Sequence, residues 1–334
     1  MLSAFEHTSV LLEESIEALN IQPSGVYIDG TDGGGGHSFE IASRLRGGRL
    51  IALDRDPEAI EAAGRRLAQF KCVTIVQTNF SQMKSVLSDL GIAAADGILL
   101  DLGASSHQFD TPERGFSYQS DALLDMRMSK QGMTAAELVN SAPFEELARI
   151  FREYGEERFA ARIASLIVRQ REQKPIETTF ELSELIKRAI PAAARRQGPH
   201  PARRVFQALR IAVNGELDEL GALLDDALGL LNEHGRLAVI TFHSLEDRMV
   251  KQRFVQWARG CTCPPDFPVC VCGKTPQAAI LYKRGIEAPE EEQQQNPRSR
   301  SARLRAVEKQ AAPQPPDTRV RLGRAAYAFF AVRS

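Results

Sequence analysis

An acidic residue and a run of glycines follow a short apolar segment near the N-terminus. Asp29 ends this segment, and four consecutive glycines occupy positions 33 to 36. Glycine adopts positive φ without strain and has no side chain to cover its N–H group, so a ligand can approach such a backbone closely. We interpret the run as a loop that binds a phosphate, a carboxylate or a ribose.

The spacing of the glycines distinguishes between two nucleotide cofactors. The dinucleotide fingerprint requires a third glycine three residues after its second, and that position is not glycine here. An acidic residue, three spacers and Gly-x-Gly is the form expected beside the amino-acid part of S-adenosylmethionine, and Asp29, Gly33 and Gly35 match it. Asp54 lies 19 residues after Gly35, where a carboxylate can bind a ribose diol. An NAD-dependent dehydrogenase would share Asp54 and stays an alternative.

Polar residues also follow two later apolar segments. Asp101 ends one of them, and its carboxylate can bind the cofactor, accept a hydrogen bond from a substrate amine or cap a helix. His243 follows the other, as a candidate general base or base-stacking platform. Ser244 and Asp247 alternatively resemble a helix-capping box.

These residues must be positioned by the elements that precede them. Short β-rich segments alternate with helical patterns, which favours an α/β fold with a parallel sheet and crossover helices. The expected strands are Val26 to Asp29, Arg49 to Leu53, Val73 to Val76, Asp96 to Asp101, Arg236 to Phe242 and Ala302 to Val307. Because open α/β sheets bind ligands at the carboxyl ends of their strands, we expect the polar residues to lie at one edge.

More than a hundred residues separate the fourth and fifth expected strands. This gap is too long for one crossover and indicates an inserted helical domain above the ligand crevice. Helical patterns fill it at Ala135 to Val139, Phe144 to Tyr154, Glu157 to Gln170 and Leu182 to Ile190, and another helix is expected at Glu246 to Ala258.

Basic residues gather in two places. Seven basic side chains and no acidic one lie between Lys187 and Arg210. A second cluster, Asn296 to Arg305, alternates arginine with small residues in the manner of a phosphate-binding loop. Either cluster alone can be a solvated surface, but two together favour a nucleic-acid partner. The candidate substrate-binding residues are Arg203, Arg204, Arg210, His243, Arg298 and Arg300.

Composition limits the class of protein. The chain has 334 residues, 43% of them hydrophobic, and can bury a large core. It has neither a bilayer-length apolar run nor a leader pattern, so we expect a cytoplasmic protein with no membrane partner. Four cysteines form two Cys-x-Cys pairs, Cys261 with Cys263 and Cys270 with Cys272. A zinc knuckle and free thiols both stay open, and we assign no metal ligand.

Many short motifs, in order along the chain, carry a resemblance to a known family. They are His7 to Glu14, Asp29 to Ser38, Asp54 to Pro57, Asp101 to Ser106, Arg114 to Ser117, Leu124 to Met128, Tyr154 to Arg158, Arg204 to Arg210, Phe242 to Arg248 and Asn296 to Ser301. Together they resemble the bacterial 16S rRNA cytosine-N4 methyltransferase family, called RsmH or MraW, up to about Glu308.

The resemblance implies a class I, Rossmann-like methyltransferase sheet with an inserted all-helical domain. It implies S-adenosylmethionine as methyl donor and a cytidine in the decoding (P-site) region of 16S rRNA, within the small ribosomal subunit, as acceptor. Another RNA or a protein acceptor is the alternative, and a homodimer stays open. By position, the cofactor contacts fall on Gly35, Gly36, His37, Asp54, Phe80, Asp101 and Gln108.

One residue of this chain departs from the family pattern. Asp32 stands in the glycine loop where an apolar residue is expected. For the N4 hydrogen we favour Asp101, or a backbone carbonyl beside it, over His243 as acceptor, in a direct in-line transfer. The expected domains are 1–110 and 209–310 for the two methyltransferase parts, 111–208 for the helical domain and 311–334 for a linker and tail.

Overall fold

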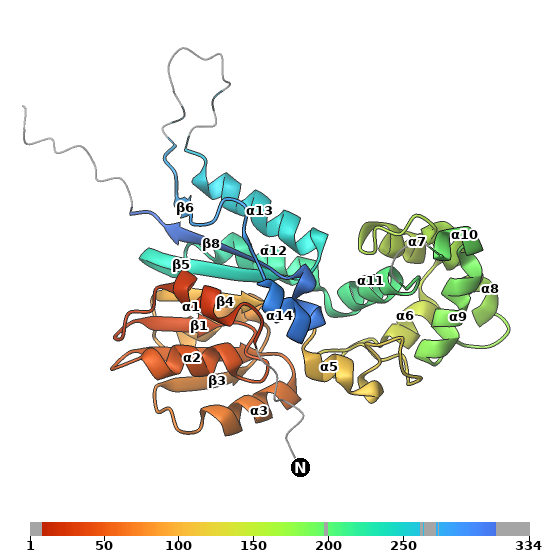
Figure 1. Ribbon diagram of the computed structural model, residues 1–334, viewed down its shortest axis with the longest axis horizontal. Coiled ribbons are helices and arrows are strands. Elements are labelled where there is room, and N and C mark those ends of the chain that lie inside the picture. Colours follow the sequence, from red (N-terminus) through yellow and green to blue (C-terminus); the bar gives the residue numbers. More distant parts are fainter. Residues whose placement is uncertain (1–8, 197–199, 261–262, 264–271, 273, 312–334) are drawn as a thin grey trace, which may run out of the picture.

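The computed structural model describes residues 9–196, 200–260, 263, 272 and 274–311. They form a single sheet with helices on both faces and a further group of helices beside it (Figure 1). The strands are β1 (Val26–Asp29), β2 (Arg49–Asp54), β3 (Val73–Gln77), β4 (Ala95–Asp101), β5 (Leu231–Thr241), β6 (Ala278–Ile280), β7 (Ile286–Glu287) and β8 (Arg303–Lys309).

The strand order in the sheet is β3-β2-β1-β4-β5-β8-β6, with β7 also paired to β8. Strands β1 to β5 are parallel, and β8 runs antiparallel to β5, β6 and β7. The parallel arrangement places the ends of β1, β2, β4 and β5 at the same edge, as the sequence predicts.

The expected strands are confirmed, with two differences at the far side of the sheet. Strand β5 begins five residues before the expected Arg236, because its pairing with β4 is irregular and jumps from Leu231 to Arg236. Strands β6 and β7 were not expected, since segments of three and two residues carry no readable alternation.

Helices pack on both faces of the sheet or follow its strands. They are α1 (Leu12–Leu19), α2 (Gly36–Arg44), α3 (Pro57–Leu67), α4 (Met83–Asp89), α13 (Ser244–Ala258) and α14 (Glu290–Gln295), with the 3₁₀ helices η1 (Phe80–Gln82) and η3 (Pro297–Ser301). Strand residues alternate between faces: Tyr27 and Leu99 pack with α1 and α2, whereas Ile28 and Ile98 pack with α4 and α13. Both faces of the parallel strands are therefore buried.

The chain between β4 and β5 is helical. Its elements are α5 (Ser106–Asp110), η2 (Pro112–Arg114), α6 (Ala135–Ser141), α7 (Phe144–Glu153), α8 (Ala160–Arg171), α9 (Thr179–Ala189), α10 (Ala192–Arg195), α11 (Arg203–Asn214) and α12 (Glu216–Asp226). Residues from Phe116 to Leu209 form an apolar core distinct from the two cores at the sheet. Figure 1 shows α6 to α10 beside the sheet, with α11 leading back toward it.

Several helix starts follow from local sequence. Thr134 with Glu137 and Thr178 with Glu181 form capping boxes at α6 and α9. The capping box of α13 lies one residue before the expected one. His243 caps the helix instead of Ser244, and its partner is Glu246 instead of Asp247. An imidazole nitrogen can accept the backbone hydrogen bond that a hydroxyl usually accepts.

Some expectations lie outside the described residues. Cys261 and Cys270 belong to this group, so the structure does not test the zinc alternative. The expected linker and tail do too, apart from Ala311. Among the helices that the structure describes, none combines the length and apolar character needed to cross a bilayer.

Candidate active site

A cavity of about 800 Å³ lies at the carboxyl ends of the parallel strands. Residues at or just after the ends of β1, β2, β4 and β5 line one side of it, among them Asp54, Asp101 and Phe242. Arg203 of α11 and Arg298 of η3 line it as well. The cavity therefore brings the sheet edge together with residues from both basic clusters.

The candidate cofactor residues gather at this cavity. Those that line it are Gly36, His37, Asp54, Phe80, Asp101 and Gln108. Gly35 is not among the lining residues, but its φ of 76° shapes the turn that precedes α2. A Cβ atom on Gly36 would lie 1.9 Å from the Ser9 Oγ, so a side chain at this position would force the Ser9 hydroxyl to move.

Asp54 is held in place by the backbone of two loops. Its Oδ2 accepts a hydrogen bond from the Gly33 N–H at 2.8 Å, and its Oδ1 accepts one from the Asp56 N–H at 2.8 Å. Burial raises the pKa of this carboxyl to about 6, against the lowering effect of these hydrogen bonds. Each oxygen keeps a lone pair, so a ribose diol can still donate to both.

Asp101 and His37 face one another in the cavity. The Asp101 Oδ2 lies 3.8 Å from the His37 Nδ1, and the His37 Nε2 lies 3.2 Å from the Val10 carbonyl. Because a carbonyl only accepts, Nε2 carries the proton and Nδ1 presents its lone pair to Asp101. Burial lowers the pKa of His37 to about 4, so the imidazole is neutral.

Asp101 itself is strongly perturbed. Burial, followed by the charges of Asp29, Glu246 and Glu292, raises its pKa well above the ordinary value. Its Oδ1 is buried and has no hydrogen-bond partner among the residues that the structure describes. A carboxylate with raised pKa and an unused oxygen is suited to accept a proton from a bound group.

Gln108 belongs to a hydrogen-bonded network around Asp56. Its Oε1 accepts from the Ser105 N–H at 3.1 Å, and its Nε2 donates to the Asp56 Oδ2 at 2.7 Å. The Arg114 Nη1 donates to the same oxygen at 2.8 Å. Arg114 is 6% exposed and was not assigned from sequence, although it lies in one of the family motifs. Gln108 and Arg114 therefore fix the start of α3 against the chain after β4.

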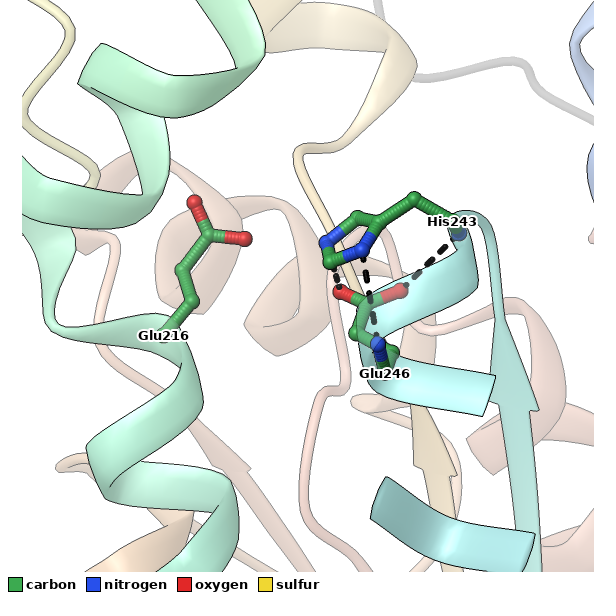
Figure 2. A group of neighbouring side chains, drawn as sticks. All are labelled: Glu216, His243 and Glu246. Carbon is green, nitrogen blue, oxygen red and sulfur yellow. Dashed lines mark hydrogen bonds and ion pairs between the residues drawn. The ribbon is translucent and has the colours of Figure 1, made fainter. Parts of the chain in front are cut away.

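Glu216, His243 and Glu246 converge beside the cavity (Figure 2). Each offers a ligand atom, and these atoms lie within 4.8 Å of one another, a group that sequence alone did not bring together. The His243 Nε2 lies 3.0 Å from the Glu246 Oε1, and its Nδ1 accepts from the Glu246 N–H at 3.4 Å. Glu246 therefore lies against both ring nitrogens of His243, but the Nε2 has no hydrogen-bond partner among the described residues.

Arg210 pairs with Glu216, the third member of this cluster. Its Nε and Nη2 donate to the two carboxylate oxygens of Glu216 at 2.8 and 2.7 Å. A metal ion would have to compete with this bidentate pair, so the cluster is better explained as a buried ion-pair network. Arg210 is 9% exposed and thus differs from the exposed phosphate contact that the sequence suggests.

The other candidate substrate residues lie on the surface. Arg203 and Arg204 are exposed at the start of α11, and Arg203 lines the cavity whereas Arg204 does not. Arg298 and Arg300 are exposed on η3, and both line it. The Arg298 Nη1 donates to Asp110 at 3.0 Å.

This fold and site define a class of enzyme. A sheet ordered 3-2-1-4-5 with an antiparallel strand beside β5 differs from the all-parallel dinucleotide-binding sheet. A glycine turn after β1 and the carboxylate of Asp54 after β2 complete a Rossmann-like nucleotide site. The protein is an S-adenosylmethionine-dependent methyltransferase, and the glycine turn and the buried carboxylates fit this cofactor.

The chain belongs to the MraW methylase family, whose model matches residues 4–310. It is 60% identical over 309 residues to the ribosomal RNA small subunit methyltransferase H of Symbiobacterium thermophilum, covering 92% of this chain and 97% of that protein. The protein of the same name from Heliobacterium modesticaldum is 56% identical, over 91% and 99% of the two chains. An rRNA methylase structure from Streptococcus thermophilus gives a TM-score of only 0.40 at 9% identity, over 93% and 99%, and supports no argument.

Proposed function

We propose that this enzyme methylates small-subunit ribosomal RNA, and that its acceptor is the exocyclic N4 of a cytidine in the decoding (P-site) region of 16S rRNA. The names of its relatives support the RNA substrate. The cytidine position follows from the family resemblance of the motifs. The observation that carries the proposal is that the cofactor residues and arginines of both basic clusters line one cavity.

Different residues would bind different parts of the cofactor. The N–H groups of the glycine turn and of the start of α2 would face the amino-acid part, Asp54 would accept from the ribose hydroxyls, and Phe80 would cover the adenine. Gly36, Asp54 and Phe80 all line the cavity. When bound, S-adenosylmethionine supplies a methyl group on a positively charged sulfur.

Asp101 is the proposed acceptor for the N4 hydrogen. The cytosine amine is a weak nucleophile because its lone pair is delocalised into the ring. A hydrogen bond from the amine to a fixed carboxylate oxygen aligns the N4 atom. The same oxygen can accept the N4 proton as the bond between N4 and the methyl carbon forms. The Asp101 Oδ1 is unused by the described chain, and the Oδ2 faces His37. No covalent protein nucleophile is needed.

The arginines would hold the RNA backbone. Arg203, Arg298 and Arg300 are exposed and line the cavity, so they can bind phosphates on either side of a base that enters it. Phosphate contacts position the RNA without reading its sequence. A base in single-stranded or flipped form is needed to reach the cavity.

One assay tests the proposal. Small subunits that lack base methylation are incubated with the enzyme and a labelled methyl donor, and the modified nucleotide is mapped. We expect label at one cytidine N4 of 16S rRNA, and transfer that is slower by ~10²- to 10⁴-fold with Asp101→Asn. Label on ribosomal protein, or on a different base, would replace the proposed acceptor. Binding of small subunits without any transfer of label would indicate an RNA-binding role alone.

A further inference from the structure

Asp32, within the glycine loop, is buried without a partner for its charge. The residue is 4% exposed and lines the cavity, and neither of its carboxylate oxygens has a hydrogen-bond partner among the described residues. Its backbone is fixed, because its N–H donates to the Leu53 carbonyl at 2.9 Å and its carbonyl accepts from Gly35 at 2.8 Å. These bonds hold the backbone of Asp32 at the wall of the cavity.

The groups around Asp32 do not satisfy it. The nearby Ser38 hydroxyl has a single proton, which it donates to the Asp29 Oδ2 at 3.0 Å. Asp29 also accepts from the Thr31 N–H. Arg66 is exposed and donates to the Gly34 carbonyl at 3.4 Å. Of the neighbouring carboxylates at this edge, Asp29 and Asp54 are both hydrogen-bonded, and Asp32 is the one with both oxygens unused.

An unpaired buried carboxylate is costly, so its presence calls for a partner that the polypeptide does not supply. Burial, and then the charge of Asp29, raises the pKa of Asp32 well above its ordinary value. A cation bound in the cavity would relieve both effects, because it would pair with the ionised form and offset the repulsion from Asp29. A positively charged group that is small enough to reach the turn would meet this requirement.

We propose that Asp32 binds the α-ammonium group of the amino-acid part of S-adenosylmethionine. This inference rests on the assignment of the methyl donor and adds a residue to its site. The ammonium group offers three N–H donors, which can satisfy the two oxygens of one carboxylate. The N–H groups of the adjacent glycine turn suit the α-carboxylate of the same ligand. Asp32 and the turn would thus bind the two charges of the amino acid side by side.

Calorimetry on the full chain with two ligands tests this contact. One ligand is S-adenosylhomocysteine, and the other is its analogue without the α-amino group. For Asp32→Asn we expect the affinity for S-adenosylhomocysteine to fall ~10- to 100-fold, because a charge-assisted hydrogen bond is lost, whereas the affinity for the analogue changes by less than about threefold. Glu61→Gln, a change at an exposed residue of α3 outside the cavity lining, is the matched control and should leave both affinities unchanged.

A second variant keeps the test decisive if the asparagine perturbs the loop. Asp32→Leu removes the buried charge, so we expect a higher melting temperature without ligand and a smaller rise on adding S-adenosylhomocysteine. Equal losses for both ligands, or undiminished discrimination between them, would refute the role of Asp32. If the unaltered protein binds neither ligand, the methyl-donor assignment fails instead, so the two failures are distinguishable.

Discussion

The two sides of the cavity are built in opposite ways. On the sheet side, Asp29 and Asp54 end strands and Asp32 lies in the turn after β1, and hydrogen bonds of the backbone hold all three largely out of water. On the other side, Arg203 at the start of α11 and Arg300 in η3 are exposed. A buried carboxyl group is fixed in one conformation and has a shifted pKa. An exposed arginine side chain keeps its charge and its conformational freedom.

This difference suits two kinds of ligand. A small cofactor has few rotatable parts, so preorganised acceptors can bind each of them at low entropic cost. An RNA backbone presents many equivalent phosphates, so adjustable arginines can bind it without an exact fit. Changes on the sheet side should therefore have large and local effects, and changes on the arginine side smaller effects that depend on salt.

The largest effect is expected for Asp101→Asn. The amide keeps the shape of the side chain but cannot accept a proton, so methyl transfer should fall ~10²- to 10⁴-fold. Single-turnover transfer of labelled methyl to small subunits measures this loss, and circular dichroism checks the fold. Glu113→Gln is the control, because Glu113 is exposed and does not line the cavity. Undiminished turnover in Asp101→Asn would remove this residue from the mechanism.

The next effect is a loss of stability when the hydrogen bonds that connect the two sides of the cavity are removed. Arg114 of η2 donates to the Asp56 carboxylate and to the backbone carbonyls of Arg127 and Met128, so it ties α3 to the helical segment. Arg114→Met leaves the Asp56 carboxylate buried with one partner fewer, and we expect a loss of ~3–5 kcal/mol in the free energy of unfolding. Urea denaturation measures it.

An exposed ion pair provides the control for this variant. Arg65 pairs with Glu61 on the surface of α3. Arg65→Met should cost less than ~1 kcal/mol, because exposed pairs contribute little. Equal costs for the two variants would mean that the network around Asp56 does not join the two sides.

Much of the sheet side could be predicted from sequence. Strand alternation and the order of motifs placed Asp54 and Asp101 at one edge, because chain direction in a parallel sheet fixes which ends meet. The glycine run pointed to its turn for a similar local reason. The unusual residue in that turn, Asp32, was visible as a departure, but its lack of hydrogen-bond partners was not.

Contacts between segments that are distant in the chain could not be predicted from the sequence. The pairing of Arg210 with Glu216, and the approach of both to His243 and Glu246, depends on how α11 and α12 meet the end of β5. Sequence showed Arg210 only as one of several arginines, and burial separates it from Arg203. Charge alone cannot tell a phosphate contact from half of a buried ion pair.

Substitutions on the arginine side should have weaker effects on affinity for small subunits, and these effects should depend on the salt concentration. Arg203→Glu should reduce affinity for small subunits ~10-fold and lower the slope of log affinity against log salt by about 1, because one phosphate contact is lost. Affinity for S-adenosylhomocysteine should not change. Arg204→Glu should have a smaller effect, since Arg204 does not line the cavity and its Nη1 donates to the Glu156 carbonyl at 3.1 Å.

The control is Arg162→Glu, which reverses a charge on the exposed surface of α8. It should leave the binding of small subunits nearly unchanged. Equal losses for Arg162, Arg203 and Arg204 would indicate a general effect of net charge rather than contacts at the cavity. Loss of cofactor affinity together with subunit affinity would mean that α11 has a structural role.

The sheet side should also show a dependence on pH that belongs to Asp54. Its pKa in the folded chain is about 6 against an ordinary value of 3.8, so the folded state holds a proton that the unfolded state has already released between these values. Stability should therefore fall as pH rises through this window, whereas affinity for S-adenosylhomocysteine should rise by up to about tenfold per pH unit, because the ionised carboxylate is the better acceptor for the ribose. Calorimetry and urea denaturation between about pH 4 and 7 measure both.

Comparison with Asp54→Asn tests this contribution. The folded His37, with a pKa of about 4, favours stability at rising pH, and Asp29, with a pKa of about 6, opposes it. Both groups persist in Asp54→Asn, but the Asp54 charge also raises the pKa of Asp29, so the difference between the variant and the unaltered chain reports on Asp54 together with its coupling to Asp29. If cofactor affinity in the variant keeps the full pH dependence, the titrating group on the sheet side is Asp29 or Asp32, and the preorganised acceptor for the ribose must be sought elsewhere.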